Sequence, residues 1–313
     1  MQLTSNTTAF IEAEQYSSFI LMNLHDGLLG TEFYRNVGDF GAGTTLHIKT
    51  VGSVTIQEAQ EDVALDYSPI ESGEVTLSIT DYVGDAWYVT DDLREDGSQV
   101  DSLMAARSAE STRAIQENFE TRFLSVANAG QTDAAANNIN GFAHRIASGE
   151  TNDVFALSHL VSMRLAFDKA NVPGEGRVFI ADPVLEATLN GLVTITTDVT
   201  PFAKDILNNG LASGMRFVQS LYGFDIILSN RLPTGSFGDG TNTVPNGVAN
   251  IAMCVLDDQT KPVMAAWRRQ PRVEGERNKD RARDEFVVRA RWGLGVQRVD
   301  TLGVIIIDAA AIV

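Results

Sequence analysis

Charged side chains at regular spacing are the first place to look for chemistry in this sequence. The segment Asp92-Leu-Arg-Glu-Asp-Gly97 resembles the start of a calcium-binding loop. Its third ligand position is Arg94, however, and its closing position is Leu103, where such a loop needs a bidentate glutamate. The segment is therefore better explained as a capped turn that precedes a helix.

Histidine and cysteine offer little material for a metal or haem site. The histidines show no ligand spacing and are His25, His47, His144 and His159. The single cysteine, Cys254, lies in an apolar run of residues 251–256, a pattern typical of a buried, inert thiol. We therefore predict no metal site.

The glycine-containing motifs of nucleotide and hydrolase sites are also missing. Gly293-Leu-Gly295 lacks the third glycine of a dinucleotide-binding loop and precedes no helix, which indicates a bend between strands. The sequence contains no Gly-x-Ser-x-Gly elbow, no Walker loop and no His-Glu-x-x-His motif. We predict that the protein is not an enzyme and has neither catalytic residues nor a cofactor.

Two pairs of arginines are better candidates for binding. Arg281 and Arg283 are two residues apart, and so are Arg289 and Arg291. In a strand, each pair would lie on one face and form a basic stripe suited to carboxylates or phosphates. No aromatic residue is interleaved with them, so the stripe is a weak indication of nucleic-acid binding.

Charge is distributed unevenly along the chain. The 313 residues carry a net charge of −17, which makes the protein a poor candidate for wrapping its whole surface around DNA. Residues 1–101 hold 18 acids and 3 bases, whereas residues 264–298 hold 10 bases and 5 acids. This asymmetry favours a contact between the two regions, within a chain or between chains; the alternative is two ordinary solvated surfaces.

The periodicity of apolar residues predicts a long hairpin. Residues 44–56 and 75–80 alternate between apolar and polar side chains, as half-buried strands do. The 18 residues between them, 57–74, hold six acids and no base. A loop of this length without a core of its own is expected to lie on another surface.

The remaining elements indicate an α+β fold rather than a regular alternation of strands and helices. Helical spacing predicts a helix capped by Asp101 that runs to about residue 129, roughly 42 Å long. The other predicted elements are helices at 157–170, 183–191 and 201–209, strands at 177–181, 216–228, 251–256 and 263–267, a loop at 232–247, a charged segment at 268–285, and two strands within 286–307 that hinge at 292–295.

Four sequence segments indicate a family through their order and spacing. They are Leu165-Ala-Phe-Asp-Lys-Ala-Asn-Val-Pro173, Gly176-Arg-Val-Phe-Ile180, Tyr222-Gly-Phe-Asp-Ile-Ile-Leu-Ser-Asn-Arg-Leu-Pro233 and Arg289-Ala-Arg-Trp-Gly-Leu-Gly-Val-Gln-Arg298. In these segments the chain resembles the major capsid (coat) protein of tailed bacteriophages of the Hong Kong ninety-seven type. The resemblance covers nearly the whole chain.

The resemblance implies a phage capsid-type fold with four parts. These are an N-terminal arm at 1–40, an extended β-hairpin called the E-loop at 41–85, a peripheral domain at 86–155 and 265–313 with a spine helix at 100–129, and an inserted axial domain at 156–264.

The resemblance also implies a function and partners. Copies of such chains form pentamers and hexamers that close into an icosahedral head shell around double-stranded DNA, which they contact non-specifically. A portal and a separate scaffolding protein are expected, because no long charged helical segment precedes the arm. Localisation would be the virion, with assembly in the host cytoplasm. Some relatives lock their shells through an E-loop lysine, but residues 57–74 contain none, so no covalent cross-link is expected.

From the charges we predict that the acidic hairpin lies on a neighbouring subunit and meets its basic stretch. The other acidic residues would keep the inner wall of the shell from binding the packaged DNA tightly. The candidate contact residues are Glu58, Glu61, Asp62, Asp66, Glu71, Glu74, Arg268, Arg269, Arg272, Arg277, Arg281 and Arg283.

Two other functions stay open at this point. One is an encapsulin-like cellular nanocompartment with the same fold and a protein cargo, and the other is an acidic hydrolase or binding module. Composition narrows the classes further. A hydrophobic fraction of 44% excludes wholesale disorder, and no apolar stretch reaches the roughly 18 residues needed to cross a membrane, so no membrane partner is expected.

Overall fold

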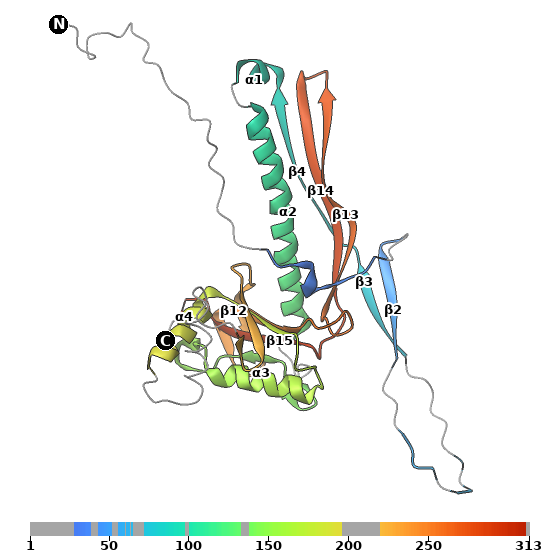
Figure 1. Ribbon diagram of the computed structural model, residues 1–313, viewed down its shortest axis with the longest axis vertical. Coiled ribbons are helices and arrows are strands. Elements are labelled where there is room, and N and C mark those ends of the chain that lie inside the picture. Colours follow the sequence, from blue (N-terminus) through green and yellow to red (C-terminus); the bar gives the residue numbers. More distant parts are fainter. Residues whose placement is uncertain are drawn as a thin grey trace, which may run out of the picture.

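Two sheets of different character, one long helix and a projecting hairpin make up the protein (Figure 1). The computed structural model describes residues 28–38, 43–51, 56–59, 61–62, 64, 72–97, 100–132, 138–195 and 220–310. The helix predicted at 201–209, His25 and the candidate contact residues Asp66 and Glu71 lie outside the described residues.

Helix α2 (Val100–Gly130) confirms the predicted long helix. Its 31 residues span about 46 Å at 1.5 Å per residue. It begins at Val100, two residues before the start that a cap at Asp101 implies, so Asp101 lies in its first turn instead of capping it. There the carboxylate still favours the positive end of the helix dipole. Ile115, Phe119 and Phe123 recur at helical spacing and are buried.

The first sheet lies beside α2 and has the strand order β1-β13-β14-β4 (Figure 1). Phe119 of α2 packs against Trp267 and Trp292, which come from two neighbouring strands of this sheet. A core between helix and sheet therefore covers one face of the sheet. The strands are β1 (Arg35–Asn36), β4 (Asp81–Thr90), β13 (Val263–Asn278) and β14 (Arg283–Val296).

Two sequence predictions for this sheet are wrong. The segment 268–285 is not merely a charged connection, because β13 and β14 extend through most of it as paired strands. The chain also does not hinge at 292–295, since β14 continues to Val296. Gly293 is needed for another reason: a Cβ there would lie 2.3 Å from the carbonyl oxygen of Ser78. The glycine lets a neighbouring strand approach the sheet closely.

The second sheet is assembled from the middle and the end of the chain. Its order is β7-β15-β12-β8-β10-β9, and β11 pairs with β12. The strands are β7 (Arg145–Ala147), β8 (Arg177–Ala181), β9 (Ser220–Leu221), β10 (Phe224–Leu228), β11 (Thr234–Gly238), β12 (Thr243–Cys254) and β15 (Leu302–Asp308).

Most predictions for this sheet are confirmed. The strand at 177–181 and the break in the strands at Tyr222-Gly223 are as expected. Helix α3 (Leu157–Lys169) buries Leu160, Met163 and Phe167, and helix α4 (Pro183–Ile195) extends beyond the predicted residue 191. The predicted loop at 232–247 is wrong, because β11 and the start of β12 form a hairpin there.

Short elements connect these layers. The rejected calcium-loop segment forms helix α1 (Asp91–Asp96), which directly precedes α2 as a turn would. The others are the 3-10 helices η2 (Thr31–Phe33) and η4 (Thr151–Asp153) and the strands β5 (Asn138–Ile139) and β6 (Phe142–Ala143).

The projecting hairpin is formed by β2 (Thr45–Val51) and β3 (Ser72–Ser78), which pair only with each other. It leaves the first sheet at the end opposite α1 (Figure 1). Leu77 and Ile79 are buried against Met264 and Ala266, and this small cluster roots the hairpin in the sheet.

Candidate subunit-contact surfaces

A cross-strand charge pair links the two strands of the acidic hairpin. Glu74 of β3 lies directly opposite Lys49 of β2, and the Lys49 Nζ donates to a Glu74 carboxylate oxygen at 2.8 Å. The other oxygen contacts His47. The hydrogen bond from Lys49 is the main cause that lowers the pKa of Glu74 from its usual value. Glu74 therefore stabilises its own hairpin and is not a free acid.

The other described acids of the hairpin are turned toward solvent. Glu58, Glu61 and Asp62 are exposed, and the neighbouring Ile56 is 91% exposed. These three carboxylates are available for a contact with another chain.

Half of the candidate arginines already have carboxylate partners in their own chain. The Arg277 guanidinium donates to Asp91 at 2.6 Å and to Asp284 at 3.2 Å. These bonds lower the pKa of Asp91 and raise that of Arg277. The other two pairs are Arg269 with Glu274 at 2.5 Å and Arg283 with Glu285 at 2.7 Å.

Arg281 corrects part of the stripe prediction. It precedes β14, and the next residue, Ala282, has a φ of 46°, so Arg281 and Arg283 do not share a strand face. Arg281 is exposed at the turn between β13 and β14, and Arg268 is also exposed. The stripe of Arg289 and Arg291 is confirmed, because both lie in β14 on either side of the buried Ala290.

The structure places four arginines together as two cross-strand pairs. Arg269 lies opposite Arg291, and Arg272 lies opposite Arg289. Directly opposed residues of antiparallel strands point to the same face. Ala290 and Trp292, which alternate with the β14 arginines, pack into the core under α2. The four side chains, here called the arginine quartet, therefore lie on the face of the sheet away from α2.

This arrangement needs a counter-charge. Like charges directly opposite each other in a sheet are destabilising. Among the described residues, the carboxylate that pairs with a quartet arginine is Glu274, which contacts Arg269. Beside the quartet is a recess of about 260 Å³, lined among others by Tyr82, Gly84 and Arg289. Tyr82 is 60% exposed. Arg289 lines this recess, and a guanidinium group at an open recess is suited to bidentate binding of a carboxylate.

The sequence indicated the arginines of β13 and those of β14 separately, but it did not predict that they lie opposite each other across the two strands. Arg289 and Arg291 were identified as a stripe, and Arg269 and Arg272 as part of the basic stretch. What joins them is the register of β13 on β14, which contains two irregularities on either side of Arg269. The intrachain partners Asp91, Glu274 and Asp284 were also missed. The sequence offers only a weak indication of these ion pairs, namely that acids lie close to arginines in the segments that become paired.

The described part of the chain contains no cluster of three or more histidine, cysteine or acidic side chains that could hold a metal ion. Cys254 is buried, as predicted. No helix among the described residues is long and apolar enough to cross a membrane.

Comparisons with known proteins agree with this architecture. A family model described as phage capsid protein matches residues 73–307. The capsid structure of the cyanophage P-SCSP1u is 19% identical, with a TM-score of 0.74 and coverage of 99% of this chain and 97% of that chain. Mycobacterium phage Che8 gives 18% identity, a TM-score of 0.68 and coverages of 96% and 98%.

The mature capsid of bacteriophage PhiM1 is 12% identical, with a TM-score of 0.72 and coverages of 96% and 93%. No curated protein matches the chain. The structural likenesses establish the α+β phage capsid-type fold, and the family model covers most of the sequence. The chain belongs to the phage capsid protein family, and it is a structural protein of the major capsid type.

Proposed function

We propose that copies of this capsid protein assemble as pentamers and hexamers into the icosahedral head shell that encloses the double-stranded DNA of a tailed bacteriophage. Family membership supports a shell role, and the shared fold supports self-association. In this proposal a separate scaffolding protein and a portal take part, and assembly occurs in the host cytoplasm before the protein becomes part of the virion.

One observation carries the assembly proposal: the hairpin acids and the arginine quartet belong to one chain but lie apart. The quartet lies on the first sheet, and the hairpin leaves that sheet at its lower end and runs away from it (Figure 1). We therefore assign Glu58, Glu61 and Asp62 of one copy to the quartet of the next. Asp66 and Glu71 are included in the proposed contact by their sequence position.

The strength of such a contact suits reversible assembly. Each exposed ion pair contributes only about 0–1 kcal/mol, so a network of them sets register more than affinity. Weak contacts summed over many subunits let misplaced copies dissociate before the shell closes. The domain division retained in this proposal is the arm at 1–40, the E-loop at 41–85, the peripheral domain at 86–155 and 265–313, and the axial domain at 156–264.

Charge reversal in the full-length chain tests the proposal. Arg272→Glu with Arg289→Glu should remove most closed shells seen by electron microscopy after expression with the neighbouring genes, because the quartet becomes repulsive to the hairpin. Glu58→Arg with Glu61→Arg should do the same. Joining the four substitutions in one chain should restore a large part of the yield, since the charges are again complementary.

Arg122→Glu is the matched control, because Arg122 is an exposed arginine on α2 and belongs to neither surface. Circular dichroism would show that each variant is folded. Normal shell yield from both reversed pairs would overturn the contact, as would a shell structure in which no hairpin acid lies near a quartet arginine of another chain. Particles that contain protein cargo and no DNA would instead support the nanocompartment alternative.

A further inference from the structure

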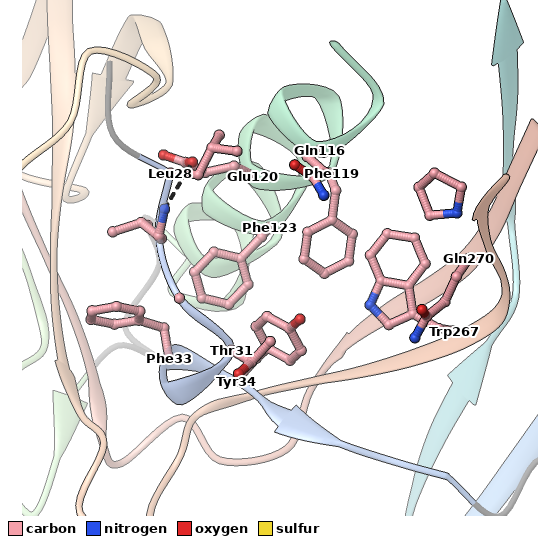
Figure 2. Close-up of a pocket in the computed structure, with 13 residues that line it drawn as sticks. Leu28, Thr31, Phe33, Tyr34, Gln116, Phe119, Glu120, Phe123, Trp267 and Gln270 are labelled. Carbon is pink, nitrogen blue, oxygen red and sulfur yellow. Dashed lines mark hydrogen bonds between the residues drawn. The ribbon is translucent and has the colours of Figure 1, made fainter. Parts of the chain in front are cut away.

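Strand β4 is the outer strand of the first sheet, and in the described part of the chain it pairs with β14 alone. Helix α2 lies over the inner strands: Phe119 stacks on Trp267 of β13, as Figure 2 shows, with 4.5 Å between the ring centroids. The far side of β4 therefore has no neighbouring strand among the described residues. The unpaired backbone groups of an edge strand are a template for another strand.

The two edges of this sheet differ in how well they resist such pairing. Beyond Ala265, β13 is also an edge, but it contains Pro271, several arginines and two register irregularities, all of which block an edge. Strand β4 has unbroken register with β14 and contains no lysine, arginine or proline. Asp85 in its middle accepts from Arg107 at 2.7 Å and from Ser111 at 2.6 Å, so its charge is paired within the chain. The edge of β4 is thus unprotected.

The side chains of β4 complement those of a second β4 that runs antiparallel to it. If Ala86 lies opposite Ala86 of a second copy, Gly84 of each copy lies opposite Tyr88 of the other, so that a small residue meets a large one. These residues are exposed and share one face of the strand. On the other face, Val83 lies opposite Val89, a pair of β-branched residues that suits a sheet.

A recess at Gly84 can receive that tyrosine. It has a volume of about 260 Å³ and is lined by Gly84, Ala86 and Arg289 among others. A Cβ at Gly84 would lie 3.2 Å from the Arg289 Cγ, so the aliphatic stem of Arg289 lies beside the glycine. An aromatic ring opposite a glycine stabilises a strand pair, and a guanidinium attracts the face of the ring. Tyr88 is 58% exposed, although Arg283 lies over its ring at 4.4 Å.

Charge favours the antiparallel arrangement over the parallel one. The sheet face away from α2 is basic at the arginine quartet and acidic near Tyr88, where Glu274, Glu276 and Glu285 lie. An antiparallel second copy places its acidic end beside the quartet, whereas a parallel copy would place like charges together. The β14 strands of the two copies would be three strand spacings apart, roughly 14 Å, and salt screens charges beyond about 10 Å. Charge therefore selects the orientation, and backbone pairing and the tyrosines provide most of the binding.

We propose that β4 binds β4 of a second copy in antiparallel orientation, with Ala86 at the two-fold axis and each Tyr88 in the Gly84 recess of the other copy. The four strands from each copy then form one continuous sheet, and the contact uses the same surface on both copies. It involves Arg289 and leaves the other three quartet arginines to the hairpin acids. This inference adds a second contact to the proposed function and does not depend on the first.

Cysteine cross-linking of the full-length chain tests this register. Ala86→Cys should give a disulfide-linked dimer under mild oxidation, because directly opposed Cα atoms are about 4.5–5.5 Å apart and a disulfide tolerates up to about 7 Å. Cys254 is buried and can stay in place. Ser158→Cys is the matched control, because Ser158 is exposed on α3, outside the first sheet, and should give several-fold less dimer. A folded Ala86→Cys variant with no more dimer than this control overturns the proposal.

Charge at the two-fold axis provides a test without cross-linking. Ala86→Lys and Ala86→Glu change an exposed residue, and circular dichroism would show that each variant is folded. Each variant alone should self-associate at least tenfold more weakly than the unchanged chain, because like charges meet at the axis. An equimolar mixture should restore association, and native mass spectrometry should show pairs with one copy of each variant. Unchanged association of either variant alone overturns the proposal.

The ring of Tyr88 is tested separately. Tyr88→Ala should weaken self-association several-fold, whereas Tyr88→Phe should retain it, because the ring fills the recess. Equal association of the two variants would remove the recess from the contact. Shell yield from the charge reversals described above is a separate measurement, so failure of the β4 contact leaves the assembly proposal intact.

Discussion

The two long hairpins of this protein show how the same backbone pattern gains stability in different ways. Strands β13 and β14 are flanked by β4 and β1 and covered on one face by α2, so their apolar residues join a large core. Strands β2 and β3 pair only with each other and touch the sheet through a small cluster at their root. An isolated two-stranded hairpin is marginally stable in water. The first hairpin is therefore complete within one chain, whereas the second needs another surface.

The largest expected effect comes from the covered hairpin. Trp292 is fully buried and packs against Phe119 and Trp267. Trp292→Ala should reduce the free energy of unfolding by about 3–5 kcal/mol, because it removes a large side chain and leaves a cavity. Guanidinium chloride unfolding of the unassembled chain measures this loss.

The matched substitution in the projecting hairpin is Ile56→Ala. Ile56 is exposed, so this change should alter the unfolding free energy by no more than about 0.5 kcal/mol. Equal losses for the two variants would remove the distinction between the hairpins.

A smaller effect is expected at the junction of the two hairpins. In Gly293→Ala, the new Cβ would lie 2.3 Å from the Ser78 carbonyl oxygen, so β3 must move away from β14. Overpacking of this kind costs about 1–3 kcal/mol. Hydrogen exchange at residues 45–51 should rise more than exchange in β15, because the root of the hairpin is displaced.

Gly275→Ala is the control for this change. Gly275 lies in the exposed half of β13, and the atoms nearest to a Cβ there belong to the Phe286 ring, the first at 3.0 Å. That ring can adjust, so the control should be close to neutral. A control as destabilising as Gly293→Ala would show that strand glycines matter in general and that the close approach to Ser78 does not.

The smallest effect is a difference in pH response. Burial lowers the pKa of His144 below its ordinary value of 6.5, despite the opposing effects of its hydrogen bond to the Phe142 backbone and of Asp300. His144 therefore binds its proton more tightly in the unfolded state than in the folded state. The fold around His144 should lose stability as the pH falls below 6.5. In the hairpin, the lowered pKa of Glu74 acts above 4.5 and is lost as the pH falls through its folded value. As the pH falls, the stabilising contribution of the His144 region should therefore decrease at a higher pH than that of Glu74 in the hairpin.

Unfolding of His144→Phe at several pH values between about 7 and 5 checks this order. The substitution keeps an aromatic ring next to Phe167, which His144 stacks on, and removes the titrating group. It should flatten the pH dependence of the unfolding free energy in this window. An unchanged slope would assign the response to other groups, such as His159, whose pKa is also lowered by burial.

The sequence predicted elements well wherever burial follows a simple period. The α2 helix, the α3 helix and strand β8 were found at nearly their observed bounds because their apolar residues recur at 3.6 or 2 positions, or run continuously. Residues 268–278 of β13 and the first three residues of β14 were missed because this segment is rich in charged residues. Their partner strands and α2 hold them in place, and that tertiary support leaves no hydrophobic signal in the sequence.

The candidate contact surface was predicted in part for a similar reason. Residue type identified the arginines, but the quartet depends on two irregularities in strand register beside Arg269, which no periodicity predicts. The hinge expected at Gly293 shows the opposite case. A glycine that permits a close approach and a glycine that bends a strand are identical in sequence, and only the position of Ser78 distinguishes them.

The narrow root of the projecting hairpin has a mechanical consequence. The hairpin is attached to the sheet through four buried side chains, those of Leu77, Ile79, Met264 and Ala266. A small tilt of the hairpin therefore exposes little apolar area and costs little free energy. The hairpin can therefore meet surfaces presented at different angles while the sheet that holds its root stays unchanged. The proposed shell requires this tolerance, because in it one polypeptide occupies both five-fold and six-fold positions of a curved lattice.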